Sequence, residues 1–192
     1  TLGYFANVDS ISSKDCIIHL APMSHGSGLY NFPHVVKGAV QVIPTSKRFD
    51  PGEILDLIGS YTGVSFFAAP TLVKRLVEHP RSKSIDTTNL KTIVYGGGPM
   101  YVADLKQALD CFGYNKFVEI YGQGESPMTI TSLSKAHHAD TGHPRFKQRL
   151  ASVGVAQSSV QIRIADENDR PVPSGKLGEI LVKGDVVMTG YW

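Results

Sequence analysis

The residues best suited to chemistry lie together in one stretch, Tyr121-Gly122-Gln123-Gly124-Glu125. The apolar residues before it predict a buried strand that ends in a turn broken by glycine. The ring of Tyr121 offers a flat face to a planar ligand, and the two glycines leave the backbone open to close approach. Glu125 adds the hard carboxylate oxygens that Mg²⁺ accepts. The stretch therefore predicts a nucleotide-binding turn.

A second stretch, Gly96-Gly97-Gly98-Pro99, follows an apolar run and precedes an amphipathic helix; we call it the glycine loop. Free N–H groups in such a loop can hold a phosphate. The Gly-Lys-Ser/Thr that completes a phosphate loop does not follow it, and its spacing differs from the dinucleotide fingerprint. A tight strand-to-helix turn without a ligand is therefore the alternative interpretation.

The histidines give weaker signals. His25 lies among small residues after the first apolar run, where a ligand contact and a surface or capping histidine both fit the sequence. His137, His138 and His143 lie close together but lack cysteine or acidic partners at a recognised spacing. We therefore predict no zinc site.

Short apolar runs alternate with amphipathic helices through most of the chain, with a pitch of roughly 25 residues. The clearest helix start is at Asp50, where Pro51 takes the first helical position and Glu53 completes a capping box. Gly113 ends the last of these helices. The predicted strands are residues 15–21, 39–43, 64–69, 91–95 and 116–121, and the predicted helices begin at residue 50 and cover residues 71–78 and 100–112.

This alternation predicts an α/β fold in which parallel βαβ units form a sheet flanked by helices. Ligands of such sheets bind outside the carboxyl ends of the strands. The glycine loop and the stretch at Tyr121 both follow strands, so we expect them to be neighbours on one edge of the sheet.

The pattern changes near residue 150. Residues 128–133 indicate one more strand, and residues 81–89 and 135–148 are polar enough to predict loops. Residues 160–164 and 178–184 then alternate as half-buried strands do. We therefore divide the chain into an α/β subdomain, residues 1–150, and the start of a small β-rich subdomain, residues 151–192.

The composition excludes several classes of protein. With 42% hydrophobic and 19% charged residues, the chain can bury a core and is not a disordered tail. The net charge is +2 without a basic run, so nucleic acid is not an expected partner. No apolar run approaches the length of a membrane span. Two cysteines far apart predict free thiols in a reducing cytosol, and apolar residues at both ends suggest a piece of a longer protein.

Six stretches, in order along nearly the whole chain, resemble motifs of the adenylate-forming superfamily, which includes acyl-CoA synthetases, aryl-CoA ligases, luciferases and the adenylation domains of peptide synthetases. The glycine loop resembles its G-G-A-P-L motif, and the stretch at Tyr121 resembles its Y-G-x-T-E motif. The matching stretches are residues 20–28, 67–72, 96–100, 121–125, 152–154 and 178–192.

The resemblance implies a role for each site residue. The glycine loop would line the adenine and acyl pockets, and Tyr121 would stack on the adenine with Gly122 beside it. Glu125 would act in catalysis by holding the Mg²⁺ that bridges the ATP phosphates. His25 would border the acyl group, and Gln123 and Gly124 would complete the nucleotide turn.

The implied reaction activates a carboxylic acid with ATP and then transfers the acyl group to a thiol, usually that of coenzyme A. Small residues around the expected pocket favour a fatty or aromatic acid over acetate. The expected protein is a cytoplasmic ligase, and we keep a homodimer as a hypothesis.

Gly124 departs from the family, which usually has a threonine there whose hydroxyl contacts a phosphate. The resemblance also places a phosphate loop, a ribose-binding Asp and a catalytic Lys outside these residues, so we expect the piece alone to be inactive. Three alternatives stay open: an adenylation domain that loads a carrier protein, a non-catalytic nucleotide- or acyl-binding relative, and an α/β domain with an unrelated ligand.

Overall fold

A computed structural model describes residues 2–192. Its elements, in chain order, are α1 Leu2–Asn7, β1 Cys16–Ile18, α2 Gly26–Leu29, α3 Asn31–Val36, β2 Val40–Val42, α4 Pro51–Ser60, β3 Val64–Ala68, α5 Pro70–Glu78, the 3₁₀ helix η1 Pro80–Ser84, β4 Leu90–Gly96, α6 Val102–Phe112, the 3₁₀ helix η2 Tyr114–Lys116, β5 Phe117–Gln123, β6 Ser126–Leu133, α7 Lys135–Ala139, α8 Phe146–Leu150, β7 Val155–Ala156, β8 Gln161–Ala165 and β9 Glu179–Lys183. The five predicted parallel strands and the three predicted helices are all present, with ends shifted by a few residues.

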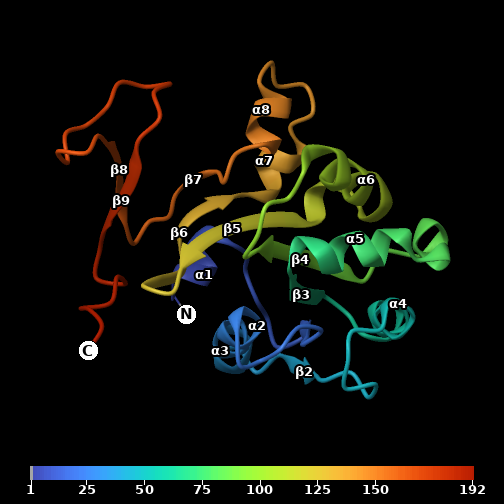
Figure 1. Ribbon diagram of the computed structural model, residues 1–192. Helices are drawn as coiled ribbons and strands as arrows, with labels where there is room; N and C mark the ends of the chain where they lie inside the picture. The colour runs from blue at the N-terminus through green and yellow to red at the C-terminus, as the bar shows by residue number, and fades with distance from the viewer. Residues whose placement is uncertain (1) are drawn as a thin grey trace.

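A seven-stranded sheet in the order β2-β1-β3-β4-β5-β6-β7 lies at the centre of the molecule (Figure 1). Strands β1 to β5 run parallel, and β6 and β7 are antiparallel additions at one edge. The predicted α/β fold, a largely parallel sheet flanked by helices, is confirmed.

Side chains alternate along each strand and so divide the core into two layers. Ile93 and Phe117 belong to the layer that packs against α4, α5 and α6. Val94 and Val118 belong to the opposite layer, with residues of α1 and of the segment around α2 and α3. All four side chains are at most 2% exposed, as expected for a parallel sheet covered on both faces.

Helix α4 begins where the sequence predicts. Asp50 is an extended N-cap residue whose carboxylate accepts from the Glu53 amide at 3.2 Å. The second half of the predicted capping box is wrong, because the Glu53 carboxylate accepts from the amide and the hydroxyl of Thr45 instead, at 2.6 and 2.8 Å. Glu53 therefore ties the segment after β2 to the start of α4.

The predicted loops at residues 81–89 and 135–148 are corrected by the structure. The first begins within η1, and the second contains α7 and the start of α8. Ser134 starts α7 with a capping box in which the His137 ring takes the place usually held by Glu or Gln. Both α7 and α8 have only five residues, too few for a helical repeat of apolar positions to be read from the sequence.

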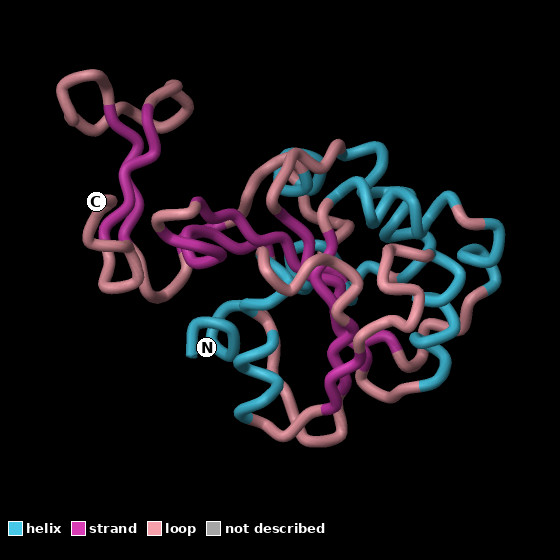
Figure 2. Tube along the Cα trace, turned by 60° about the horizontal axis from the view of Figure 1, so that its bottom comes forward, coloured by secondary structure: helices cyan, strands magenta, loops and turns pink. Residues whose placement is uncertain are grey.

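The β-pattern after residue 151 is borne out by three strands. Strand β7 still pairs with β6 in the main sheet, whereas β8 and β9 form a separate antiparallel pair that stands off from it (Figure 2). The domain boundary at residue 150 stays a prediction. None of the helices within residues 2–192 has the length and apolarity of a bilayer span.

Candidate functional site

The glycine loop leaves β4 at the carboxyl end of the parallel strands. Gly96, the last residue of β4, is in register with Ile120 of β5. A Cβ on Gly96 would lie 2.1 Å from the carbonyl oxygen of Ile120, so the strand pairing itself requires glycine there. Gly97, with φ of +76°, and the following Gly98 and Pro99 are exposed. A ligand could therefore reach the loop from Gly97 onward.

The stretch at Tyr121 belongs to a β-hairpin. Strand β5 continues through Gln123 and β6 begins at Ser126, so the turn consists of Gly124 and Glu125 alone. The prediction that the strand ends at Tyr121 is wrong, because β5 continues through Gln123 and β6 folds back antiparallel to pair with it. Residues that looked like a loop in the sequence are thus held by a sheet.

Gly122 lies at a register irregularity between Tyr121 and Gln123. A Cβ on Gly122 would lie 2.2 Å from the amide nitrogen of Met128, so the hairpin strands can approach this closely only with glycine. The half-buried Tyr121 ring is steadied by a hydrogen bond in which Gln123 Nε2 donates to its hydroxyl at 3.0 Å. The ring is therefore held while part of its surface stays open.

Glu125 is exposed at the tip of the hairpin. The hydroxyl of Tyr191 donates to its Oε1 at 2.9 Å, and the amide of Met188 donates to its carbonyl oxygen at 2.8 Å. Its own backbone amide and the Tyr191 hydroxyl hold the pKa of this carboxyl below its ordinary value. Glu125 is thus an anion that faces solvent.

The predicted proximity of the glycine loop and the stretch at Tyr121 is confirmed by the strand register. Gly96 and Ile120 are partners on neighbouring strands, so the glycine loop begins beside Tyr121. His25 is exposed at the start of α2, and within the described chain its side chain makes no capping hydrogen bond. The residue after it, Gly26, contacts the hairpin: a Cβ there would lie 2.6 Å from Met128 Cε.

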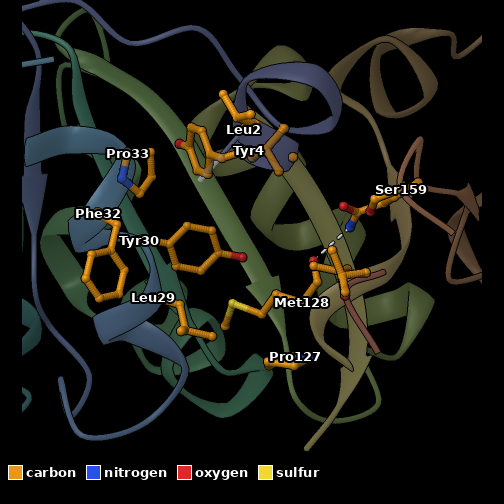
Figure 3. A pocket seen from close by; sticks show the side chains of 14 residues that line it. Leu2, Tyr4, Leu29, Tyr30, Phe32, Pro33, Pro127, Met128 and Ser159 are labelled. Carbon is orange, nitrogen blue, oxygen red and sulfur yellow. Dashed lines mark hydrogen bonds between the residues drawn. The ribbon is translucent and has the colours of Figure 1, made fainter. Parts of the chain in front are cut away.

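An apolar cavity of about 470 Å³ lies beside the hairpin, against α1, α2 and α3 (Figure 3). Its walls include Leu2 and Tyr4 of α1, Leu29 and Phe32 around the α2–α3 junction, and Pro127 and Met128 of β6. Pro127 and Met128 directly follow the hairpin turn, so a molecule in the cavity would lie next to the Tyr121 segment. His25 is not among the residues that line it.

Three buried polar residues under the site were missed in the sequence. Tyr95, Glu119 and His138 are 0%, 8% and 0% exposed. Burial raises the pKa of Glu119 to about 7, although a hydrogen bond with Tyr95 lowers it, and burial lowers the pKa of His138 to about 4. The signal available in the sequence was a glutamate inside an apolar strand, where charged residues are rare.

The residues present fit a magnesium ion bound mainly through phosphates. Within residues 2–192 there is no group of three or more His, Cys, Asp or Glu side chains that could hold a metal by themselves. Mg²⁺ usually takes only one or two protein carboxylates, together with water and substrate phosphates. The exposed, ionised Glu125 matches that requirement.

A parallel α/β sheet whose carboxyl edge carries an open glycine loop and a hairpin, with an apolar cavity beside the hairpin, is the arrangement of a small-molecule-binding α/β domain. The chain belongs to the AMP-binding enzyme family, which it matches over residues 2–192. The structure resembles that of a mutant form of the amide bond synthetase McbA from Marinactinospora thermotolerans, with a TM-score of 0.85, 26% identity, and coverage of 99% of this chain and 37% of that chain.

Curated relatives are ligases and synthetases. The chain is 33% identical over 171 residues to the medium/long-chain-fatty-acid–CoA ligase FadD8 of Mycobacterium tuberculosis, covering 89% of this chain and 28% of that protein. It is 32% identical over 184 residues to a feruloyl-CoA synthase of an Amycolatopsis species, covering 95% and 35%. It is 27% identical over 203 residues to the fatty acid–acyl-carrier-protein ligase ScoC of Streptomyces coeruleorubidus, covering 99% and 37%. The chain thus spans about a third of the length of these relatives.

Proposed function

We propose that the protein containing this chain is an ATP-dependent ligase that activates a carboxylic acid as an acyl-adenylate and passes the acyl group to a thiol. The observation that carries the proposal is the pairing of Gly96 with Ile120, which sets the glycine loop beside Tyr121 at the carboxyl edge of the sheet. Membership of the AMP-binding enzyme family and the ligase names of the relatives support it.

The nucleotide would bind across the glycine loop and the hairpin. Its adenine would stack on the exposed part of the Tyr121 ring, with Gly122, Gln123 and Gly124 bordering the phosphates. Aromatic stacking tolerates little rotation of the ring, and the bond from Gln123 to the Tyr121 hydroxyl would limit that rotation. The exposed part of the glycine loop would leave room for the sugar and the acyl group.

Two bond exchanges make up the reaction. In the first, a carboxylate oxygen of the acid attacks the α-phosphorus of ATP, and the bond to pyrophosphate breaks. In the second, the thiol sulfur attacks the acyl carbonyl carbon, AMP leaves, and the thiol proton passes to solvent. Mg²⁺ bound by Glu125 and the phosphates would supply the positive charge that stabilises the first transition state.

The cavity beside the hairpin supports a fatty or aromatic acid as substrate. Its volume of about 470 Å³ and its apolar walls suit a chain or ring larger than acetate. His25 would border the carboxylate end of the acid rather than line the cavity, because its ring is exposed at the start of α2.

The acceptor thiol would be coenzyme A. The relative ScoC is named for an acyl carrier protein, so loading of a carrier protein is the second candidate. The two are separated by supplying either coenzyme A or a phosphopantetheinylated carrier protein after the adenylate has formed. Thioester formation with the carrier protein alone would favour the second candidate.

We propose further features of the protein. Cys16 and Cys111 are free thiols, which supports a cytoplasmic location. The separation of the β8–β9 pair from the main sheet supports a subdomain change near residue 150. We also propose that the isolated piece is inactive and that the whole protein forms a homodimer, which pyrophosphate exchange and light scattering would test.

The central test is exchange of labelled pyrophosphate into ATP by the full-length protein, across a panel of fatty and aromatic acids. Exchange with at least one acid is expected. Tyr121→Ala should raise the KM for ATP roughly tenfold to a hundredfold, because stacking on a base contributes about 1–3 kcal/mol. Tyr121→Phe keeps the ring but loses the bond from Gln123, so it should raise the KM for ATP less than Tyr121→Ala does.

A substitution at Gly124 distinguishes an active ligase from a non-catalytic relative. Gly124→Thr restores the hydroxyl usual in the family and should leave exchange intact or faster. If no acid supports exchange, Gly124→Thr restores none and AMP still binds, the non-catalytic binding protein is favoured instead.

A further inference from the structure

Three polar side chains are buried together directly beneath the glycine loop and the stretch at Tyr121. Tyr95 immediately precedes the glycine loop, and Glu119 lies on β5 shortly before Tyr121. Tyr95 and Glu119 are register partners on neighbouring strands, so their side chains lie on the same face of the sheet. His138 of α7 meets them on that face, with its ring centroid 5.7 Å from that of Tyr95.

The hydrogen bonds fix where the protons lie. The Nδ1 atom of His138 is 2.9 Å from the carbonyl oxygen of Ser134, which can only accept, so Nδ1 carries the ring proton. In the neutral ring, Nε2 is then an acceptor, and the hydroxyl oxygen of Tyr95 lies 2.9 Å from it. Tyr95 therefore donates its single proton to His138.

When all three side chains are uncharged, the remaining hydrogen bond is the one between Glu119 and Tyr95. Its Oε2 is 3.3 Å from the same Tyr95 oxygen, which has already given its proton to His138 and can only accept. While His138 is neutral, a protonated Glu119 that donates to Tyr95 satisfies these contacts, and once Glu119 is ionised it is Tyr95 that donates to the carboxylate. The raised pKa of Glu119, about 7, and the lowered pKa of His138, about 4, agree with a pair that is uncharged in mildly acidic solution.

Ionisation of Glu119 reverses the order of the bonds. A carboxylate can only accept, so the Tyr95 hydroxyl would turn its proton toward Glu119. The Nε2 of His138 would then be buried without a donor, which is costly inside a protein. Helix α7 would lose its polar link to β4 and β5.

The groups around the Glu119 carboxyl offer no compensating cation within the described residues. Tyr95 faces it from β4, Leu133 is its register partner on β6, and His138 faces it from α7. The two other titratable groups of α7 are held elsewhere: His137 by the helix cap, and Lys135 by an ion pair with an aspartate. Burial has the larger influence and raises the pKa of Glu119, whereas the hydrogen bond from Tyr95 to the carboxylate lowers it.

We infer that Tyr95, Glu119 and His138 form a proton-linked positioning network that holds the glycine loop and the Tyr121 hairpin in register, and that loss of the Glu119 proton loosens the nucleotide site. The inference rests on the proposed function, since it assigns the nucleotide to these segments. The three residues act through the backbone of β4 and β5, because none of them reaches the open face of the site.

The first experiment measures the affinity of the full-length protein for AMP between pH 5.5 and 8.5 by calorimetry, in parallel with the KM for ATP in pyrophosphate exchange. The wild-type dissociation constant should rise roughly tenfold as pH passes through about 7, the size of effect expected from one hydrogen bond. Glu119→Gln keeps a donor to Tyr95 but cannot ionise, so its affinity should change with pH only as far as the AMP phosphate itself titrates at pH ~6. Glu78→Gln, at an exposed position on α5, is the matched control and should follow the wild type.

A second readout is independent of the ligase reaction. Infrared difference spectra of the wild type against Glu119→Gln should show a protonated-carboxyl stretching band that disappears as pH rises through about 7. If Glu119→Gln does not fold, Tyr95→Phe replaces it: the ring volume is kept, the link to His138 is lost, and AMP affinity should be weak at every pH.

The outcomes separate the two proposals. A wild-type pH profile that Glu119→Gln reproduces, or the absence of the protonated-carboxyl band at low pH, overturns the network. If the band titrates as expected but no acid supports pyrophosphate exchange, the proposed ligase function fails while the protonation of the network stands.

Discussion

Two glutamates on the same hairpin have opposite environments. Glu119 is 8% exposed, and burial raises its pKa to about 7. Glu125 is exposed at the hairpin tip, and hydrogen bonds from its own amide and from Tyr191 lower its pKa. Desolvation therefore favours the neutral acid at one position, and donated hydrogen bonds favour the anion at the other. The difference suits the buried one to holding structure and the exposed one to holding a cation.

The largest expected effect comes from removing the charge at the exposed position. Glu125→Gln keeps the size and polarity of the side chain but supplies only a neutral oxygen to Mg²⁺. The rate of pyrophosphate exchange should fall about 10²- to 10³-fold, similar to the loss of one electrostatic stabiliser of a transition state. Exchange measured over a range of Mg²⁺ concentrations would show whether saturating metal recovers part of the rate.

Glu179→Gln on β9 is the matched control for that experiment, since it removes a carboxylate from the separate β8–β9 pair. Its exchange rate should equal that of the wild type. A Glu125→Gln protein with unchanged exchange would remove the cation role from Glu125, and the contrast with Glu119 would then be one of exposure alone.

A smaller effect is expected on stability, at the buried position. The pKa of Glu119 is about 7 in the folded state and ordinarily 4.5, so between these values only the folded state keeps the proton and the free energy of unfolding falls as pH rises. The pKa of His138 is about 4 instead of 6.5, so the free energy of unfolding falls as pH drops through that range. Between pH 4.5 and 6.5 the effects of Glu119 and His138 oppose each other, so the free energy of unfolding of the wild type should change little with pH.

Glu119→Gln removes the contribution of Glu119 to the pH dependence of the free energy of unfolding and leaves that of His138. Its free energy of unfolding should therefore rise by roughly 3 kcal/mol from pH 4 to 6.5, in urea titrations of the full-length protein followed by circular dichroism. Glu125→Gln should keep the wild-type profile above about pH 5, where the Glu125 carboxyl is ionised in both the folded and the unfolded state. A Glu119→Gln profile as flat as that of the wild type would mean that His138 is not a buried neutral base in the folded protein.

The part of the fold that could be predicted from the sequence is the part with local signals. Asp50 and Pro51 mark the start of α4, and Gly113, with φ of +102°, ends α6 as predicted. Apolar runs of strand length between such helices were sufficient to predict the parallel sheet, because few other folds accommodate strands and helices that alternate in this way. The glycine loop and Tyr121 could be placed together for the same reason.

What could not be predicted depends on contacts between distant residues. The hairpin looked like a loop because Gly122 and Gly124 read as a break, whereas the pairing of β6 with β5 holds Tyr121 and Gln123 in a strand. The role of Glu119 depends on His138, which lies in a polar segment without helical periodicity. A predicted site residue such as Gly96 also proved to be required by the strand pairing itself.

The smallest expected effect tests whether Glu125 depends on its neighbour as Glu119 depends on Tyr95. The Tyr191 hydroxyl donates to Glu125 at 2.9 Å, but Tyr191 is 77% exposed, so water can replace this bond. Tyr191→Phe should therefore raise the pKa of Glu125 only part of the way to its ordinary value, since the bond from its own amide remains. The Mg²⁺ concentration that gives half-maximal exchange should change by no more than about fivefold, because an exposed polar pair contributes about 0.2–1 kcal/mol. Tyr101→Phe, at another exposed tyrosine, is the control. A loss of tenfold or more with Tyr191→Phe alone would show that the exposed glutamate is positioned by a specific partner, and solvent exposure would then no longer explain the difference between the two glutamates.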